Sequence, residues 1–250
     1  MHNSISDLVT VVIPVLNEEE AIERVIKRVM AEGYQNILVV DGFSVDETVF
    51  RARSAGVKVI FQEGKGKTGA IATAINNLET PYVLFMDGDC TYDPRDIINI
   101  VSVLGNADLV IGVRTNGREN IPLFNRLGNW FINFEFNTLI GAKLFDVCSG
   151  MYGLRTKFAK ALNLTTSGFD VEVEIAAQAV KCGIVAQVPI LYHDRVGQQK
   201  LQPVRHGFQI ILTVVKLAWR NNFNGNLSPR LSSEYSVKSK FSMSNDRLSD

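Results

Sequence analysis

The sequence predicts an α/β protein in which helices cover both faces of a mostly parallel β-sheet. Over residues 8–113, short apolar runs rich in β-branched residues alternate with segments long enough to form helices, which is typical of parallel sheets. The runs are apolar throughout, which predicts strands buried on both faces. With 250 residues, 46% of them hydrophobic and 21% charged, the chain is long enough for one large globular domain, or at most two small ones.

Five strands and four helices are predicted in this part of the chain. The predicted strands are residues 8–13, 37–40, 57–61, 82–86 and 109–113. The predicted helices are residues 18–31, 46–55, 68–78 and 94–104. The last helix has the clearest start, because Asp93 is a suitable N-cap and Pro94 suits the first helical position. Ligands of such sheets bind at the carboxyl ends of the strands, so the loops after the strands are the candidates for function.

The pattern changes after residue 120. The elements predicted there are an aromatic-rich helix at 121–140, a strand and turn at 146–155, a helix at 171–182, a last strand at 185–188 and an amphipathic helix at 204–220. Residues 225–250 are rich in serine and have no sustained periodicity, which predicts a disordered tail.

Composition limits the class of protein. The 26 Lys and Arg balance the 26 Asp and Glu, which argues against a general nucleic-acid binder. Three cysteines do not make a disulfide framework and favour a reducing compartment. Residues 1–7 do not form a secretory signal, and polar residues interrupt the longest apolar stretch, 208–219. We therefore expect a cytoplasmic protein that is soluble or bound to a membrane surface.

The strongest local motif is Asp87-Gly88-Asp89, directly after the strand at 82–86. Two neighbouring carboxylates are costly unless a cation lies between them, and their oxygens suit Mg²⁺ or Mn²⁺ with phosphates completing the shell. Solvated turn aspartates, or the Asp-x-Asp-x-Thr nucleophile of haloacid-dehalogenase-type phosphatases, are alternatives. The phosphatase needs this motif on the first strand and a later acidic pair, whereas Asp108 and Asp146 each stand alone. The metal–diphosphate interpretation is favoured.

Two other loops offer ligand contacts. Asp41 ends a strand, where an acidic residue often binds a base or ribose, although an Asx turn leading to a helix capped by Ser44 or Asp46 is an equal alternative. The glycine-rich loop 63–68 is not a phosphate-binding Walker A loop, because Phe61 stands where the first glycine is needed. Its backbone and Lys67 could still attract an anion.

Several motifs occur in one order along the chain. They are Pro14-x-x-Asn17-Glu18, Val-Val-Asp41-x-x-Ser44-x-Asp46-x-Thr48, Asp87-Gly88-Asp89, Ile111-Gly112-Val113-Arg114, Asp146-Val147-Cys148-Ser149-Gly150-Met151-Tyr152, and Asp194-Arg195 followed by Gln199-Lys200-Leu201. Together they resemble family 2 glycosyltransferases of the GT-A fold, and among these the dolichyl-phosphate mannose synthase group and its polyprenyl-phosphate hexosyltransferase relatives. The resemblance implies a catalytic domain over residues 1–224, with a nucleotide-sugar-binding half at 8–113 and an acceptor-binding, membrane-facing half at 114–224.

The resemblance also implies roles for individual residues. Those implied to bind the nucleotide sugar are Pro14, Leu16, Glu18, Val40, Asp41, Lys67, Asp87 and Gly88. Those implied to bind phosphates or line the acceptor pocket are Arg114, Arg126, Ser149, Gly150, Arg195 and Lys200, of which Arg114 and Arg195 are catalytic with Asp89. Asp89 would bind Mg²⁺ or Mn²⁺. Thr91 stands where the family commonly has a Gln that assists the metal, so Thr91 is a doubtful ligand.

The implied reaction is the inverting transfer of a hexose from a nucleotide sugar to dolichyl or polyprenyl phosphate, which makes a lipid-linked sugar. Mannose from GDP-mannose is favoured over glucose from UDP-glucose. One alternative is a saccharide acceptor, which needs a carboxylate base; Asp170, Glu172 and Glu174 are candidates, unless they form the solvated face of a capped helix. Another alternative is a non-catalytic subunit that binds nucleotide sugars.

The last part of the chain favours a lipid acceptor. Between Arg195 and Ser233 there are six Lys or Arg and no Asp or Glu. The predicted helix at 204–220 combines apolar and basic residues, which suits an anionic membrane surface, and the helix at 120–140 could lie beside it. Core helices or a dimer interface are the alternatives. We expect peripheral binding to the cytoplasmic face of a membrane, directly or through a partner subunit or a homo-oligomer.

Overall fold

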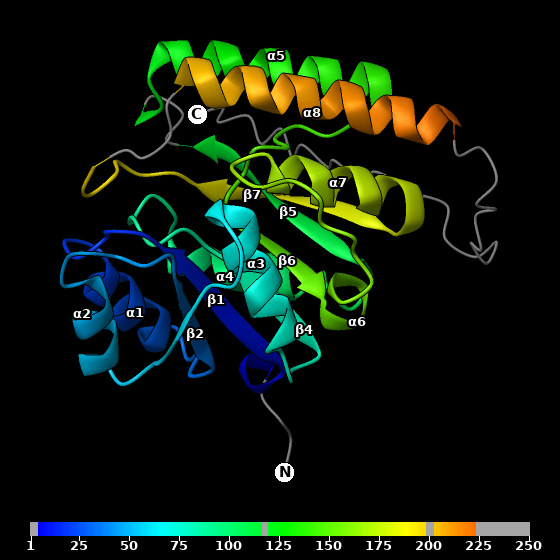
Figure 1. The fold of residues 1–250 in the computed structure, drawn as a ribbon. Helices are drawn as coiled ribbons and strands as arrows, with labels where there is room; N and C mark the ends of the chain where they lie inside the picture. Colours follow the sequence, from blue (N-terminus) through cyan, green and yellow to red (C-terminus); the bar gives the residue numbers. More distant parts are fainter. Residues whose placement is uncertain (1–4, 117–119, 199–202, 224–250) are drawn as a thin grey trace, which may run out of the picture.

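The computed structural model describes residues 5–116, 120–198 and 203–223 (Figure 1). Its centre is a seven-stranded sheet in the order β3-β2-β1-β4-β6-β5-β7. The strands are β1 (Val9–Val15), β2 (Ile37–Asp41), β3 (Lys58–Phe61), β4 (Tyr82–Phe85), β5 (Leu109–Asn116), β6 (Tyr152–Arg155) and β7 (Val185–Leu191). Only β6 runs antiparallel to its neighbours among these strands, so the predicted mostly parallel sheet is confirmed.

Helices cover both faces of the sheet, as predicted. They are α1 (Ile22–Ala31), α2 (Thr48–Ser54), α3 (Gly66–Asn76), α4 (Ile97–Val101), α5 (Leu123–Ile140), α6 (Thr156–Ala159), α7 (Val171–Cys182) and α8 (Pro203–Phe223), with short 3₁₀ turns η1 (Ile5–Leu8) and η2 (Pro94–Asp96). One hydrophobic cluster joins the sheet to α1, α2 and α4, and a second joins it to α3, α5, α7 and α8. These two layers of core fix the strands whose ends carry the site.

Several predicted boundaries differ from the structure. The helix predicted at 94–104 is a 3₁₀ turn followed by the short α4, although Asp93 does cap its start by accepting a hydrogen bond from the Arg95 N–H at 3.0 Å. The helix predicted from residue 18 begins at Ile22. The prediction that every strand is fully buried is wrong for β3, because it is the edge strand and two of its residues are exposed. The predicted tail lies outside the described residues.

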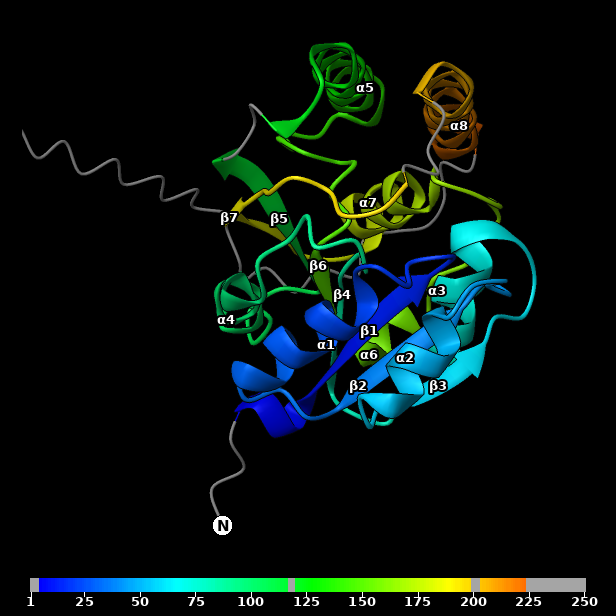
Figure 2. The ribbon, with the colours of Figure 1, turned by 90° about the vertical axis from the view of Figure 1, so that its left-hand side faces the viewer.

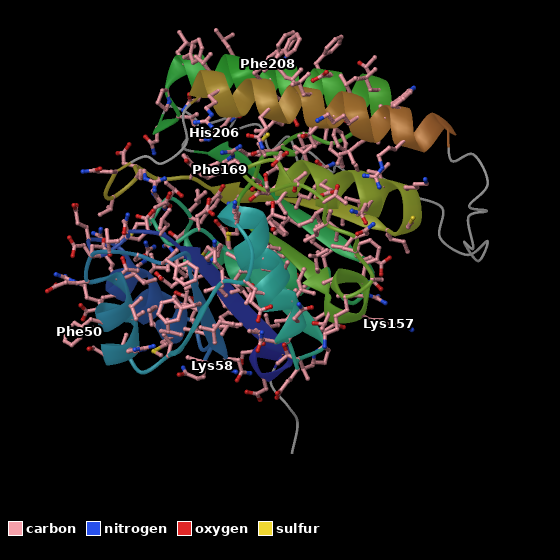
Figure 3. The ribbon with its side chains drawn as sticks, viewed as in Figure 1. Phe50, Lys58, Lys157, Phe169, His206 and Phe208 are labelled. Atoms are coloured by element: carbon pink, nitrogen blue, oxygen red, sulfur yellow. The ribbon has the colours of Figure 1, made fainter. Side chains whose placement is uncertain are left out.

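Helices α5 and α8 lie side by side and form the outermost layer, with α7 between them and the sheet (Figure 2). Asp170, just before α7, accepts hydrogen bonds from Thr213 Oγ1 (2.8 Å) and Gln209 Nε2 (3.3 Å) of α8. The Phe169 ring also lies 4.9 Å from the His206 ring of α8 (Figure 3). No helix in the described part of the chain is long and apolar enough to cross a membrane.

Candidate active site

The loops that follow β1, β2 and β4 meet at one edge of the sheet, because these strands are parallel neighbours. The Asp-Gly-Asp loop (87–89) follows β4. A later segment, 192–196, runs alongside this loop, and the Val196 N–H donates a hydrogen bond to the Asp89 carbonyl oxygen at 2.9 Å. This pairing brings Arg195 to the acidic loop from more than a hundred residues away in the sequence.

Arg195 lies between two buried carboxylates. Its Nη2 is 2.6 Å from Glu18 Oε1, and its Nη1 is 2.7 Å from Asp89 Oδ2. Burial raises the pKa of Asp89, and the nearby charge of Asp87 raises it further, whereas Arg195 lowers it. The guanidinium therefore occupies a position where the two carboxylates favour a cation. Glu18, implied to contact the nucleotide sugar, here holds Arg195.

A second cation, Lys67, lies between another pair of carboxylates. Its Nζ is 2.6 Å from Asp87 Oδ1 and 2.6 Å from Glu172 Oε1. Burial lowers the pKa of Lys67, but the charges of Asp87 and Glu172 outweigh burial and raise it well above its usual value. Burial raises the pKa of Glu172. Lys67 is thus a fixed positive charge beside the Asp-Gly-Asp loop.

The three carboxylates considered as bases have different surroundings. Asp170, Glu172 and Glu174 are all buried, so the alternative of a solvated helix face is wrong. Asp170 binds α8, and Glu174 accepts hydrogen bonds from the backbone N–H groups of Thr165 and Thr166 at 2.9–3.0 Å. Of the three, Glu172 is the one whose described contacts lie in the site.

Two glycines allow the acidic loop to pack closely. A Cβ at Gly88 would lie 2.9 Å from Val15 Cγ1, and a Cβ at Gly150 would collide with the Asp87 carboxylate. Ser149 is buried beside Gly150. The structure therefore places this predicted acceptor segment against Asp87.

Asp41 is fully buried at the end of β2. It accepts hydrogen bonds from the Ser44 N–H (2.8 Å) and the Ser44 hydroxyl (2.5 Å), which is the turn weighed as an alternative for this loop. Pro14 pairs with Val40 across β1 and β2, and the buried Val40 side chain leaves only its backbone for a ligand. Asp46 binds the N–H of Thr48 at the start of α2.

Three exposed apolar side chains stand near the strand ends on either side of Asp41. They are Leu16, Phe43 and Phe61, which stand at or just after the ends of β1, β2 and β3. The Phe43 and Phe61 rings stack with centroids 5.6 Å apart. Phe43 has a φ of 66°, a left-handed conformation that is unfavourable for a bulky residue. Sequence reasoning assigned no role to Phe61, and its position at a strand end was the signal that could have found it.

Arg114 is paired with Asp146. Its Nε and Nη2 each lie 2.6 Å from an oxygen of Asp146, and its guanidinium lies 5.3 Å from the centroid of the Tyr192 ring. The partner of Asp146 is thus a cation and not a second carboxylate. Arg126 is exposed on α5, and Lys200 lies outside the described residues.

Within the acidic loop, Asp89 is the side chain that could bind a divalent metal. Thr91 donates its hydroxyl (2.5 Å) and its N–H (3.0 Å) to Asp89 Oδ1, so Thr91 orients Asp89. The other oxygen of Asp89 faces Arg195. The described residues contain no group of three or more His, Cys, Asp or Glu that could hold a metal ion. The residues therefore fit a hard cation only if a ligand such as a diphosphate supplies further oxygens.

Comparisons with known proteins show the family to which the chain belongs. The family model described as glycosyl transferase family 2 matches residues 10–162. Glycosyltransferase AglJ of Haloferax volcanii is 35% identical over 223 residues, covering 86% of this chain and 74% of that protein. The dolichyl-phosphate hexose transferase of the same organism is 32% identical over 216 residues, covering 84% and 94%.

Among solved structures, glucosyl-3-phosphoglycerate synthase from Mycobacterium tuberculosis, in complex with Mn²⁺, UDP-glucose and phosphoglyceric acid, superimposes with a TM-score of 0.70 at 22% identity. The match covers 88% of this chain and 85% of that one, which shows a shared fold. The family match covers more than half of the chain. The chain therefore belongs to the family 2 glycosyltransferases and has a fold of the GT-A type.

Proposed function

We propose that the protein transfers a hexose from a nucleotide sugar to a polyprenyl phosphate of the dolichyl type. The observation that carries this proposal is the combination, in one molecule, of a charge-dense sheet edge with an exposed apolar layer formed by α5 and α8. The first suits a diphosphate and the second suits a lipid. The 32% identity to a dolichyl-phosphate hexose transferase supports the same acceptor class. Mannose from GDP-mannose is the favoured donor, followed by glucose from UDP-glucose.

The donor would lie over the ends of β1, β2 and β4. Leu16, Phe43 and Phe61 present apolar surface for a flat base next to the Asp41 turn. Asp89 would hold Mg²⁺ or Mn²⁺. When bound, the metal neutralises the charge that develops on the leaving diphosphate. Lys67 adds a fixed positive charge on the other side of the loop.

Arg195 would serve the acceptor. A cation held by Asp89 would take over one of the two carboxylates that Arg195 contacts, and the guanidinium, with Glu18 as its remaining partner, could then bind the acceptor phosphate. A phosphate monoester has its second pKa at about 6, so its oxygen is already anionic at neutral pH and needs no general base. That oxygen forms a bond to the anomeric carbon as the bond to the diphosphate oxygen breaks. Attack from the opposite face inverts the anomeric centre.

The outer layer would place the acceptor at a membrane. The exposed apolar side chains of α5 are Leu123, Phe124, Leu127, Trp130, Phe131, Phe134 and Leu139, and those of α8 are Val204, Phe208, Leu212, Val215 and Trp219. The exposed basic residues Arg126, Arg205, Lys216 and Arg220 lie on the same two helices. Apolar surface with interspersed basic residues suits an anionic bilayer surface. We propose peripheral binding on the cytoplasmic face.

A transfer assay tests the proposal. The full chain is incubated with Mn²⁺ or Mg²⁺, labelled GDP-mannose or UDP-glucose, and dolichyl phosphate in detergent. Label that enters the organic phase identifies both the reaction and the sugar. Label that stays in water with both donors contradicts the lipid acceptor. Donor binding without turnover on any acceptor indicates the non-catalytic subunit, and activity only with membrane fractions indicates a partner subunit.

A saccharide acceptor is the second candidate, because Glu172 could act as its base. Glu172 lies beside Lys67 at the site, and burial raises its pKa. A base with a raised pKa suits deprotonation of a hydroxyl. Loss of activity in Glu172→Gln on a soluble saccharide, with no transfer to lipid phosphate, would favour this function.

A further inference from the structure

A second concave site lies behind the segment that carries Arg195. It is a pocket of about 370 Å³, within the size range of small-molecule sites. Its charged lining includes Arg24, Arg28, Asp93, Arg95, His193 and Asp194. Of these residues, sequence reasoning singled out Asp93 as a helix cap and Asp194 as part of a motif, and it gave the pocket no ligand.

Asp93 fixes the direction of two of the arginines. The carboxylate is fully buried and lies 3.0 Å from Arg28 Nη2 and 2.7 Å from Arg95 Nη2. His193 Nε2 lies 3.2 Å from the same carboxylate. These contacts hold the guanidiniums in place, which lowers the entropy cost of binding a ligand. A guanidinium has five N–H donors, so Arg95 has donors beyond the Nε and Nη2 that contact Asp93.

The pocket carries excess positive charge. Arg24, Arg28 and Arg95 outnumber the carboxylates of Asp93 and Asp194, even with His193 neutral. Arg24 lies one helical turn before Arg28 on α1, so arginines from α1 and from η2 line the same pocket. Guanidiniums match the oxygens of phosphate, and several can share one phosphate group. The volume exceeds that of one phosphate ion.

We infer that this pocket binds a small anion of the phosphate monoester or diphosphate class, at a site distinct from the donor site. His193, Asp194 and Val196 line the pocket, whereas Arg195, within the same segment, contacts Glu18 and Asp89 of the active site. The segment 193–196 therefore borders both the pocket and the active site. This inference goes beyond the proposed transfer reaction and does not depend on it.

Titration calorimetry of the full chain with pyrophosphate and with inorganic phosphate, without divalent metal, tests the inference. Arg24→Gln and Arg95→Gln should each weaken binding of pyrophosphate by about tenfold, the loss of one charge-assisted contact. Arg53→Gln, which changes an exposed arginine of α2, is the matched control and should leave affinity unchanged. Arg195→Gln should also leave it unchanged.

Three results would overturn the inference: no binding of either anion, binding that survives both Arg24→Gln and Arg95→Gln, or binding that Arg195→Gln abolishes. If Arg95→Gln unfolds because Asp93 loses a partner, the pyrophosphate affinity of Arg24→Gln still tests the inference. Vesicles of phosphatidylcholine with or without phosphatidic acid then separate the ligand sources. Displacement of pyrophosphate by phosphatidic acid supports a lipid headgroup at this site, and its absence supports a soluble phosphate.

Discussion

The carboxyl edge of the sheet and the α5–α8 layer each invert the usual distribution of polar and apolar groups, in opposite ways. At the edge, the buried carboxylates of Glu172, Glu18 and Asp89 are each paired with a cation, Glu172 with Lys67 and the other two with Arg195. In the layer, Trp130 and Phe208 are large apolar side chains with 64% and 62% of their surface exposed. Buried charges cost desolvation, and exposed apolar patches mark interaction surfaces. The comparison supports the proposal that a polar, anionic ligand binds at the edge and an apolar one on the layer.

Within the edge, the two cations Lys67 and Arg195 differ in how much they are exposed and in the element that carries them. The Lys67 side chain is 14% exposed and is carried by α3, whereas the Arg195 side chain is 28% exposed and is carried by a loop. Each lies between two carboxylates. We therefore expect Lys67 to be a permanent part of the structure and Arg195 to be exchangeable for another cation.

Asp89→Asn should have the largest effect. Removal of this carboxylate should lower the transfer rate about a thousandfold, because the charge of the leaving diphosphate is no longer offset by a metal held at that point. The fold should persist, since Arg195 keeps Glu18 as its partner. The measurement is the rate of label transfer together with Mn²⁺ binding followed by electron paramagnetic resonance. Asp7→Asn, at an exposed aspartate, is the control, and unchanged Mn²⁺ binding in Asp89→Asn would contradict the metal assignment.

Lys67→Met and Arg195→Met should separate the permanent cation from the exchangeable one. Lys67→Met removes the cation from the buried Glu172 and from the partly exposed Asp87, and it should lower the free energy of unfolding by about 3 kcal/mol. Arg195→Met should cost about 2 kcal/mol in EDTA. Mn²⁺ should restore much of the second loss and none of the first. Urea unfolding in EDTA and in Mn²⁺ measures the free energy of unfolding of both variants. If Mn²⁺ restores the same free energy in each, the distinction between a permanent and an exchangeable cation is wrong.

The pH dependence of the stability of Lys67→Met tests whether Lys67 is the permanent partner of Glu172. Burial raises the folded-state pKa of Glu172 above its unfolded value, and loss of Lys67 should raise it further. A carboxyl group whose pKa is raised on folding adds stability below its unfolded pKa, and this stability is lost as the pH rises through the folded pKa. The stability deficit of Lys67→Met should therefore shrink from pH 8 to pH 5. Lys67→Met with Glu172→Gln should remove most of that dependence.

Local sequence patterns predicted most of the helices and strands. They did not predict which charged residues pair when those residues are far apart in the sequence. The bounds of α7 match the helix predicted at 171–182, and the Asp-Gly-Asp loop was placed at the sheet edge because its strand ends there. The pairs formed by Arg114 with Asp146 and by Arg195 with Glu18 join residues 32 and 177 positions apart. Such pairs depend on how β6 and β7 enter the sheet, and no periodicity in the sequence records that.

Phe208→Asp should weaken membrane binding. Phe208 lies on the outer side of α8, away from the sheet (Figure 3), so a carboxylate there removes apolar contact and adds repulsion from anionic lipid. We expect the partition constant of the protein for anionic vesicles to fall about tenfold. Phe50→Asp is the matched control, because Phe50 is 69% exposed on α2, far from the α5–α8 layer. Equal losses in both variants would break the comparison between the two regions.

Phe43→Gly addresses the exposed apolar surface that Leu16, Phe43 and Phe61 form at the charged edge, and its effect should be the smallest. If the Phe43 ring stacks on the base of the donor, its removal should weaken donor binding about fivefold, near the lower limit for stacking on a base. Glycine adopts the φ of 66° without strain, which offsets its greater entropy cost on folding, so stability should change little. Donor affinity from calorimetry and urea unfolding measure the two effects separately. Phe50→Gly should leave donor affinity unchanged, and a loss of stability in Phe43→Gly without a loss of donor affinity would mean that the ring serves only its contact with Phe61.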